Sequence, residues 1–142
     1  MLLPFEQDFF DAIISVDAYL YFGLQAGFME EKLAPLLKVA GEIALAFPGF
    51  KRELSLPLPP EFLLSWKAED LEPFHSCEWW QALLAGAPSI ELQAVKEMEC
   101  CEESWQDWLQ CENPYAVNDR LAMSAGAGAY MNMIAVRAKK QA

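Results

Sequence analysis

The fold depends on the interpretation of residues 28–47, FMEEKLAPLLKVAGEIALAF. Apolar side chains in this stretch recur mostly three or four positions apart, at Met29, Leu33, Leu36, Leu37, Ala40, Ile43, Ala44 and Phe47. On an α-helix this spacing forms one apolar stripe, while Glu31, Lys38 and Glu42 fall on the opposite side. The stretch therefore predicts an amphipathic helix, which the turn-forming sequence FPGF at 47–50 ends.

Helical spacing also extends to both sides of that stretch. Residues 5–24 predict a helix with a broad apolar face, and Asp17 falls in the middle of this face. Residues 90–111 predict another helix, because apolar residues between them repeat three or four positions apart. Residues 118–139 are apolar on nearly every side up to Arg137 and rich in Ala and Gly. Such a composition is typical of a helix at the centre of a bundle.

Start and stop signals divide the rest of the chain. Residues 51–60, KRELSLPLPP, are rich in proline and predict a linker between an N-terminal helix pair and the C-terminal helices. Ser76 can cap the helix that follows it, and Asn113 before Pro114 marks another helix start. Strand signals are almost absent, and 142 residues fit one domain. We therefore predict an all-α fold, a single-domain bundle over 1–142 with about five to seven helices around the C-terminal one.

The charge balance is strongly acidic. Twenty-one Asp and Glu residues stand against ten Lys and Arg residues, which gives a formal net charge of −11. Such a surface repels phosphates and anionic lipid, so it disfavours nucleic acid and membrane surfaces and favours a basic protein partner. The N-terminus lacks a basic region, and the longest uncharged stretch, 121–136, is too short to span a bilayer. We therefore predict a cytoplasmic protein with free thiols.

No residue pattern predicts a metal, cofactor or catalytic site. The cysteines and the single histidine, His75, Cys77, Cys100, Cys101 and Cys111, include no closely spaced ligand pair of the kind that zinc sites use. On one helix, the adjacent Cys100 and Cys101 would point in diverging directions. His75 and Cys77 lie too close in sequence for a nucleophile pair of known layout. The run GAGAY at 126–130 lacks the third glycine and the preceding strand of a phosphate loop.

An acidic helical face is the strongest candidate for an interaction surface. Glu99, Glu103 and Asp107 are spaced at i, i+4 and i+8 opposite the apolar stripe, and Glu102 extends the negative region. Tryptophans at the edge of such a face can anchor a partner. The predicted partner-binding residues are Glu99, Glu102, Glu103, Asp107, Trp105, Trp108 and Asp17.

Asp17 allows a second interpretation. A carboxylate on an apolar helical face is either buried and paired or exposed because the face meets a partner. Arg120 or Arg137 could supply the internal pair. The sequence leaves both alternatives open.

These observations favour a binding protein. In size, acidity and lack of catalytic motifs the chain is similar to bacterial immunity proteins and antitoxins. The resemblance implies an inhibitor of a basic effector or toxin enzyme. The first alternative is an acidic chaperone or adaptor for a secreted protein, which would form a homodimer. The last alternative is an enzyme with an unrecognised carboxylate site. Because a binding protein is favoured, the sequence predicts that the chain is not an enzyme.

Overall fold

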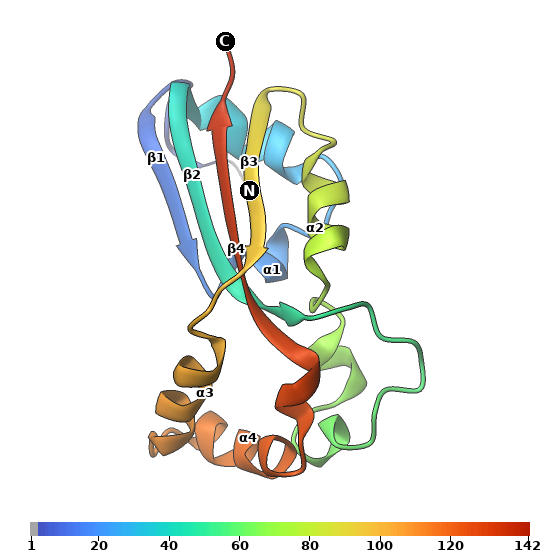
Figure 1. Ribbon diagram of the computed structural model, residues 1–142. Coiled ribbons are helices and arrows are strands. Elements are labelled where there is room, and N and C mark those ends of the chain that lie inside the picture. The colour runs from blue at the N-terminus through green and yellow to red at the C-terminus, as the bar shows by residue number, and fades with distance from the viewer. Residues whose placement is uncertain (1–2) are drawn as a thin grey trace.

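The computed structural model describes residues 3–142 and shows a mixed α/β protein (Figure 1). Its sheet contains β1 (Phe10–Val16), β2 (Leu37–Phe50), β3 (Ile90–Glu97) and β4 (Met131–Lys140). The strand order is β1-β2-β4-β3. Strands β1 and β2 run parallel, and β4 runs antiparallel to both of its neighbours.

The helices occupy two places around the sheet. Helices α1 (Tyr19–Phe22) and α2 (Cys77–Leu84) lie beside one face of the sheet, whereas α3 (Cys101–Gln110) and α4 (Pro114–Ser124) lie beyond one end of it (Figure 1). Short helical turns complete both parts, at Met29–Leu33, Ala34–Leu36, Phe62–Leu64, Ala68–Leu71 and Ala127–Tyr130. We call α3, α4 and the turns at 62–71 and 127–130 the helical end.

The prediction of an all-α bundle is wrong, and β2 shows why. Its residues alternate, with Ile43, Leu45 and Phe47 buried and Glu42 and Ala44 exposed between them. Residues at positions 43, 44 and 47 satisfy a helical period, but 43, 45 and 47 satisfy the period of two that strands follow. Hydrogen bonding to β1 on one side and to β4 on the other decides in favour of the strand.

Three other predicted helices are also wrong in whole or in part. Within residues 5–24 only α1 is an α-helix, and the preceding Phe10–Val16 is strand β1. The stretch 90–111 divides into β3 and α3. The predicted central helix at 118–139 divides too, because α4 ends at Ser124 and β4 follows. Gly126, with φ +103°, adopts the left-handed conformation that glycine tolerates between these two elements.

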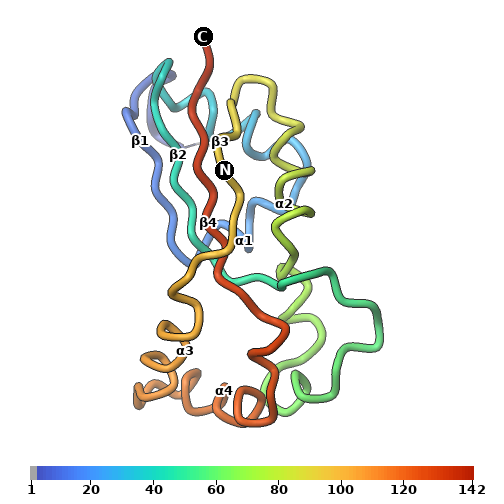
Figure 2. The backbone as a smooth tube through the Cα atoms, in the orientation of Figure 1, coloured from blue at the N-terminus to red at the C-terminus, as the bar shows by residue number. Residues whose placement is uncertain are grey.

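Two hydrophobic cores hold the molecule together. The first lies between the sheet and helices α1 and α2, and it includes Tyr19, Phe47 and Trp80. The second lies in the helical end and includes Phe62 and Met131. Because β2 and β4 are long enough to reach both cores, they join the two parts. Residues 51–61, which follow β2 in the chain, form neither helix nor strand and run outward from the body (Figure 2).

The β1 edge and one face of the sheet are uncovered within residues 3–142. Strand β1 is an edge strand, and its Ile14 and Val16 are 73% and 68% exposed. Ala44 of β2, which pairs with Ile14, is exposed on the same face. Purely parallel sheets are ordinarily covered on both faces, whereas this mixed sheet leaves the face that carries Ile14, Val16 and Ala44 open. This edge and face can therefore accept further secondary structure.

None of the helices between residues 3 and 142 is long and apolar enough to traverse a lipid bilayer.

Candidate functional site

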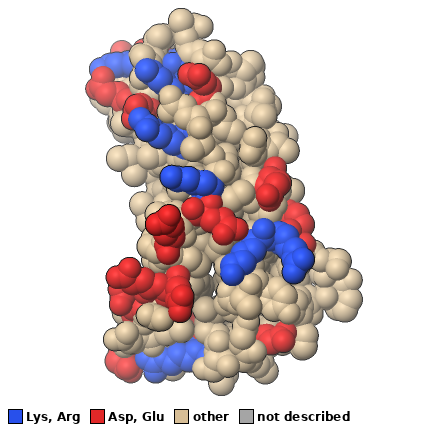
Figure 3. Space-filling view, in the orientation of Figure 1, with Lys and Arg blue, Asp and Glu red and all other residues tan. Residues whose placement is uncertain are grey.

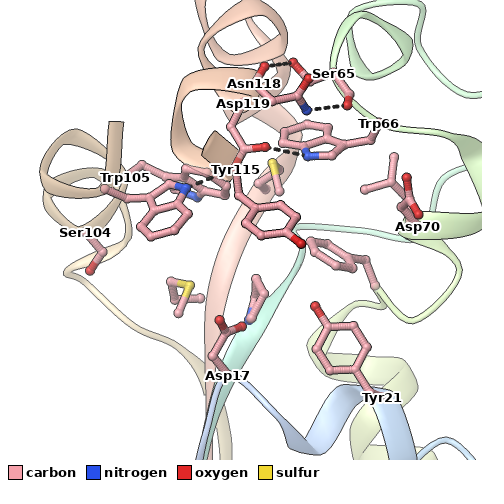
Figure 4. Close-up of a pocket in the computed structure, with 16 residues that line it drawn as sticks. Asp17, Tyr21, Ser65, Trp66, Asp70, Ser104, Trp105, Tyr115, Asn118 and Asp119 are labelled. Carbon is pink, nitrogen blue, oxygen red and sulfur yellow. Dashed lines mark hydrogen bonds between the residues drawn. The ribbon is translucent and has the colours of Figure 1, made fainter. Parts of the chain in front are cut away.

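A pocket of about 680 Å³ lies between the carboxyl end of β1 and the helical end (Figure 4). Its volume falls in the range of small-molecule sites. We call it the end pocket. Residues from both halves of the chain line it: Asp17, Tyr21, Pro48, Ser65, Trp66, Asp70, Leu71, Phe74, Ser104, Trp105, Trp108, Tyr115, Asn118, Asp119, Met131 and Met133. In open α/β sheets, ligands bind outside the carboxyl ends of the parallel strands, which is where this pocket lies.

Asp17 occupies the turn that leads from β1 into α1. Its φ is +53°, in the left-handed region that Asp tolerates better than most residues. The Asp17 amide donates a hydrogen bond of 2.8 Å to the Ala46 carbonyl of β2, which fixes the turn to the sheet. Partial burial raises the pKa of the Asp17 carboxyl above its usual value. The turn therefore holds a carboxylate with increased proton affinity at the pocket wall.

Of the two alternatives for Asp17, pairing with Arg120 or Arg137 is not the one that the structure shows. Arg120 donates to the carbonyl oxygens of Leu109 and Cys111 and to Glu112, at 2.8 to 3.2 Å. Arg137 instead pairs with Glu42 at 3.2 Å. Across residues 3–142, no ion pair involves Asp17. This arrangement leaves its carboxylate available to a ligand.

Asp119 is a carboxylate buried in the wall of the end pocket, with 9% of its surface exposed. Its two oxygens accept hydrogen bonds from two indoles, Trp66 Nε1 at 2.8 Å and Trp108 Nε1 at 2.9 Å. These bonds join three segments, because Trp108 lies on α3, Asp119 on α4 and Trp66 after the turn at 62–64. Hydrogen bonds to a carboxylate are stronger than those between neutral groups. Asp119 therefore organises the helical end around the pocket.

Ser65 and Asn118 fix the same wall next to Asp119 and Trp66 (Figure 4). The Ser65 hydroxyl donates to the Asn118 carbonyl at 2.6 Å and accepts the Ala122 amide at 2.9 Å. The Asn118 side chain donates to the Ser65 carbonyl at 2.6 Å. Segment 62–66 is thereby locked to α4, and Trp66 is held in position.

Tyr21 lines the end pocket together with two carboxylates, Asp17 and Asp70. Its pKa is raised by burial first, and then by the charges of Asp17 and Asp70. Asp70 accepts the Lys67 amide at 2.9 Å, which places its carboxylate at the start of a helical turn. The lining includes these three carboxylates, Asp17, Asp70 and Asp119, but no Lys, Arg or His. The end pocket is therefore electronegative.

The structure separates the residues that the sequence predicted as one interaction surface. Asp17, Trp105 and Trp108 line the end pocket. Four acidic residues lie outside it and are exposed on or before α3: Glu99, Glu102, Glu103 and Asp107. Figure 3 shows acidic side chains gathered over α3. A basic partner for this acidic face stays a prediction.

Sequence reasoning missed most of the pocket. It gave no role to Tyr21, Trp66, Asp70, Tyr115 or Asp119, all of which line the cavity. The bond between Trp66 and Asp119 spans 53 positions, so no local spacing could indicate it. Asp17 was detectable because a carboxylate interrupts an apolar run.

The cysteines and His75 contribute no site of their own. His75 stacks on Trp79 with ring centroids 3.6 Å apart and contacts Glu53 at 2.7 Å. Burial raises the pKa of the Cys77 and Cys101 thiols, which makes them less reactive as thiolates. The described part of the chain contains no group of three His, Cys, Asp or Glu residues placed to hold a metal ion. The absence of a bound metal stays a prediction.

The fold is similar to that of several known enzymes. No protein-family model and no curated protein sequence matches the chain. Among solved structures, the [4+2]-cyclase SpnF aligns with a TM-score of 0.62 and 16% identity, over 98% of this chain and 52% of that one. Geranyl diphosphate C-methyltransferase from Streptomyces coelicolor A3(2) aligns with a TM-score of 0.67 and 13% identity, over 97% of this chain and 49% of that one.

A third similar structure is phosphoethanolamine N-methyltransferase 2 of Haemonchus contortus, with a TM-score of 0.63 and 15% identity. It aligns over 97% of this chain and 35% of its own length. The chain thus spans about half the length, or less, of these three structures. The likeness defines the class of fold: the α/β fold of S-adenosylmethionine-dependent methyltransferases, which the cyclase shares.

This finding corrects the functional hypotheses drawn from the sequence. An all-α immunity-type inhibitor is excluded, because the fold is α/β and is shared with methyltransferases and a cyclase. The same likeness contradicts the expectation that the chain is not an enzyme, because its fold is of an enzyme type. It offers no support for the chaperone or adaptor alternative.

The end pocket offers no cationic partner to the carboxylate of the methyl donor that two of these structures hold as S-adenosyl-L-methionine or its product S-adenosyl-L-homocysteine, although its own carboxylates suit the cationic sulfonium and ammonium groups of S-adenosyl-L-methionine. That donor carries an amino-acid carboxylate, which needs a cation or a cradle of backbone N–H groups. The lining offers three carboxylates and no cationic side chain. Strand β1 leads into α1 through Asp17 and Ala18, not through a glycine-rich turn. The lining therefore provides neither a cationic side chain nor a glycine-rich turn for the carboxylate of this donor.

Proposed function

We propose that this chain forms the substrate-binding half of a group-transfer enzyme that acts on a small organic molecule. The observation that carries the proposal is the end pocket itself, which places Asp17 beyond the carboxyl end of a parallel strand. The fold shared with methyltransferases and a cyclase supports an enzymatic role. The indole-bonded carboxylate of Asp119 supports a preformed site, because both of its oxygens are already fixed.

Asp17 is the residue best suited to accept a proton. A hydroxyl, amine or acidic carbon that receives a transferred group loses a proton, and the proton moves to a nearby base. A base works best when its pKa is close to the ambient pH, and burial shifts the pKa of Asp17 in that direction. The fixed turn between β1 and α1 holds this carboxylate at the pocket wall.

The donor side of the reaction belongs to structure outside the end pocket. The uncovered edge of β1 is next to Asp17 in the chain, so structure added at that edge would lie beside the pocket. Exposed Ile14 and Val16 supply the apolar surface that such an addition would bury. A test of function must therefore use the protein in the cell that produces it, where the structure that adds to the β1 edge is also present.

Replacing Asp17 by Asn in the native gene tests the proposal. Asn has nearly the same size and tolerates the positive φ, but it cannot accept the proton. We expect a small molecule to accumulate in cell extracts and a product that differs from it by the transferred group to disappear. Mass spectrometry of extracts measures both changes, and immunoblotting checks that the variant is present at the wild-type level.

Asp107→Asn is the matched control, because Asp107 is an exposed carboxylate outside the pocket. It should leave the small-molecule profile unchanged. If Asp17→Asn cells contain normal amounts of the variant protein and the wild-type set of small molecules, the proposed function is wrong.

A further inference from the structure

We propose that the end pocket recognises an organic cation, a substrate that carries an ammonium group next to an apolar body. This inference rests on the proposed function and names the chemical class of its substrate. Two properties of the pocket wall carry it: unpaired negative charge and a high density of aromatic faces.

The charge argument begins with Asp119. Asp119 is buried, with 9% of its residue surface exposed, and its side-chain hydrogen-bond donors within residues 3–142 are two neutral indole N–H groups. A buried charge is normally compensated by an opposite charge. Arg120, the next residue, is engaged by two carbonyls and Glu112 instead. A cationic ligand would supply the missing compensation.

Two further carboxylates add negative charge to the same pocket wall. Asp17 and Asp70 line the pocket together with Tyr21, whose pKa is raised by burial and then by the charges of these two carboxylates. Neither residue forms an ion pair within residues 3–142. A phosphate or carboxylate ligand would be repelled from this wall, whereas an ammonium would be attracted.

The aromatic argument concerns the shape of the cation that fits. Six aromatic side chains line the cavity: Tyr21, Trp66, Phe74, Trp105, Trp108 and Tyr115. The face of an aromatic ring attracts cations, tryptophan most strongly, and aromatic cages are a common way to bind quaternary ammonium groups. Trp66 and Trp105 pack against each other in this wall, with ring centroids 6.4 Å apart and an interplanar angle of 57°.

The rest of the lining suits an apolar body. Pro48, Leu71, Met131 and Met133 add aliphatic and thioether surface to the aromatic walls. Methionine side chains adapt to irregular ligand shapes. A cavity of about 680 Å³ is larger than an ammonium head alone requires. The chemistry therefore points to an amphiphilic amine or quaternary ammonium compound.

Choline and 3,3-dimethyl-1-butanol provide a direct test, because they have the same shape and differ in charge. Purified full-length protein is titrated with each, and calorimetry and tryptophan fluorescence report binding, since three of the five tryptophans line the pocket. We expect choline to bind about tenfold or more tightly than its neutral analogue. Equal affinity, tighter binding of the neutral compound, or binding of neither would overturn the inference.

The double variant Asp17→Asn/Asp70→Asn locates the effect. It should weaken choline binding by about fivefold or more while leaving the neutral analogue unaffected, because it removes charge without changing shape. Glu103→Gln/Asp107→Asn removes the same amount of charge outside the pocket and should have no effect on either compound. Loss of choline binding in this control variant would contradict a specific site. If choline does not bind but the Asp17→Asn cells show the expected small-molecule changes, this inference is wrong and the proposed function stands.

Discussion

Asp119→Ala is expected to lower the free energy of unfolding by about 3 kcal/mol or more. The substitution removes the acceptor of two indole N–H groups, from Trp66 and Trp108, and leaves both donors without it in a partly buried wall. Each buried donor left without a partner costs about 1–3 kcal/mol. Chemical denaturation monitored by circular dichroism measures the change.

Asp119→Asn should give an intermediate loss of stability. Its carbonyl oxygen can accept one indole N–H, while its amide NH₂ faces the other donor. Asp107→Ala is the control, because that carboxylate is exposed on α3, and its effect should stay within about 0.5 kcal/mol. A free energy of unfolding for Asp119→Ala that equals that of the wild type would show that the two indole bonds do not organise the helical end.

Trp80→Ala should cost about 3–5 kcal/mol of stability. Trp80 is fully buried in the first core and packs against Phe47 and Tyr19, with ring centroids 4.7 and 5.8 Å away. Removal of the indole leaves a large cavity between α2 and the sheet. Thermal and chemical unfolding both measure the loss.

Trp80→Phe separates packing from hydrogen bonding. Among residues 3–142 the buried Trp80 Nε1 has no hydrogen-bond partner, so phenylalanine removes an unpaired donor together with some volume. The loss should therefore be less than half of that for Trp80→Ala. Leu121→Ala, at a side chain that is 61% exposed, should change stability by less than about 0.5 kcal/mol. Equal losses for Trp80→Ala and Leu121→Ala would contradict the described core.

Local signals in the sequence identified two helices correctly. Ser76 caps α2, and its hydroxyl accepts the Trp79 amide at 3.2 Å, which confirms the predicted helix start. Asn113 and Pro114 begin α4, and the Asn113 side chain accepts the Tyr115 amide at 2.9 Å. Caps depend on residues a few positions apart, so the sequence displays them directly.

The strands could not be identified in the same way. In β2 the apolar residues fit both periods, and alanine at positions 40, 44 and 46 carries little information about either. The Ala- and Gly-rich stretch before β4 favoured a helix, although β4 is central because it pairs with both β2 and β3. Such pairing brings together residues far apart in the chain, which a pattern within one window does not contain.

The site was only partly accessible for the same reason. Asp17, Trp105 and Trp108 stood out because carboxylates on apolar faces and clustered tryptophans are unusual. Their common location was invisible, since Asp17 was placed on a helix and not at the end of a strand. The acidic residues of α3 stood out in the sequence because they are numerous. The carboxylates that line the pocket besides Asp17 are instead Asp70 and Asp119.

The central claim is that the end pocket is a binding site for a small organic cation, and the indole N–H resonances of the five tryptophans test it most directly. Trp66, Trp105 and Trp108 line the pocket, whereas Trp79 and Trp80 lie in or against the first core. During titration with choline, two-dimensional ¹H–¹⁵N spectra should show the first three resonances moving in a saturable manner while the other two stay fixed. Resonances that do not move, or that move only for Trp79 and Trp80, would contradict the account.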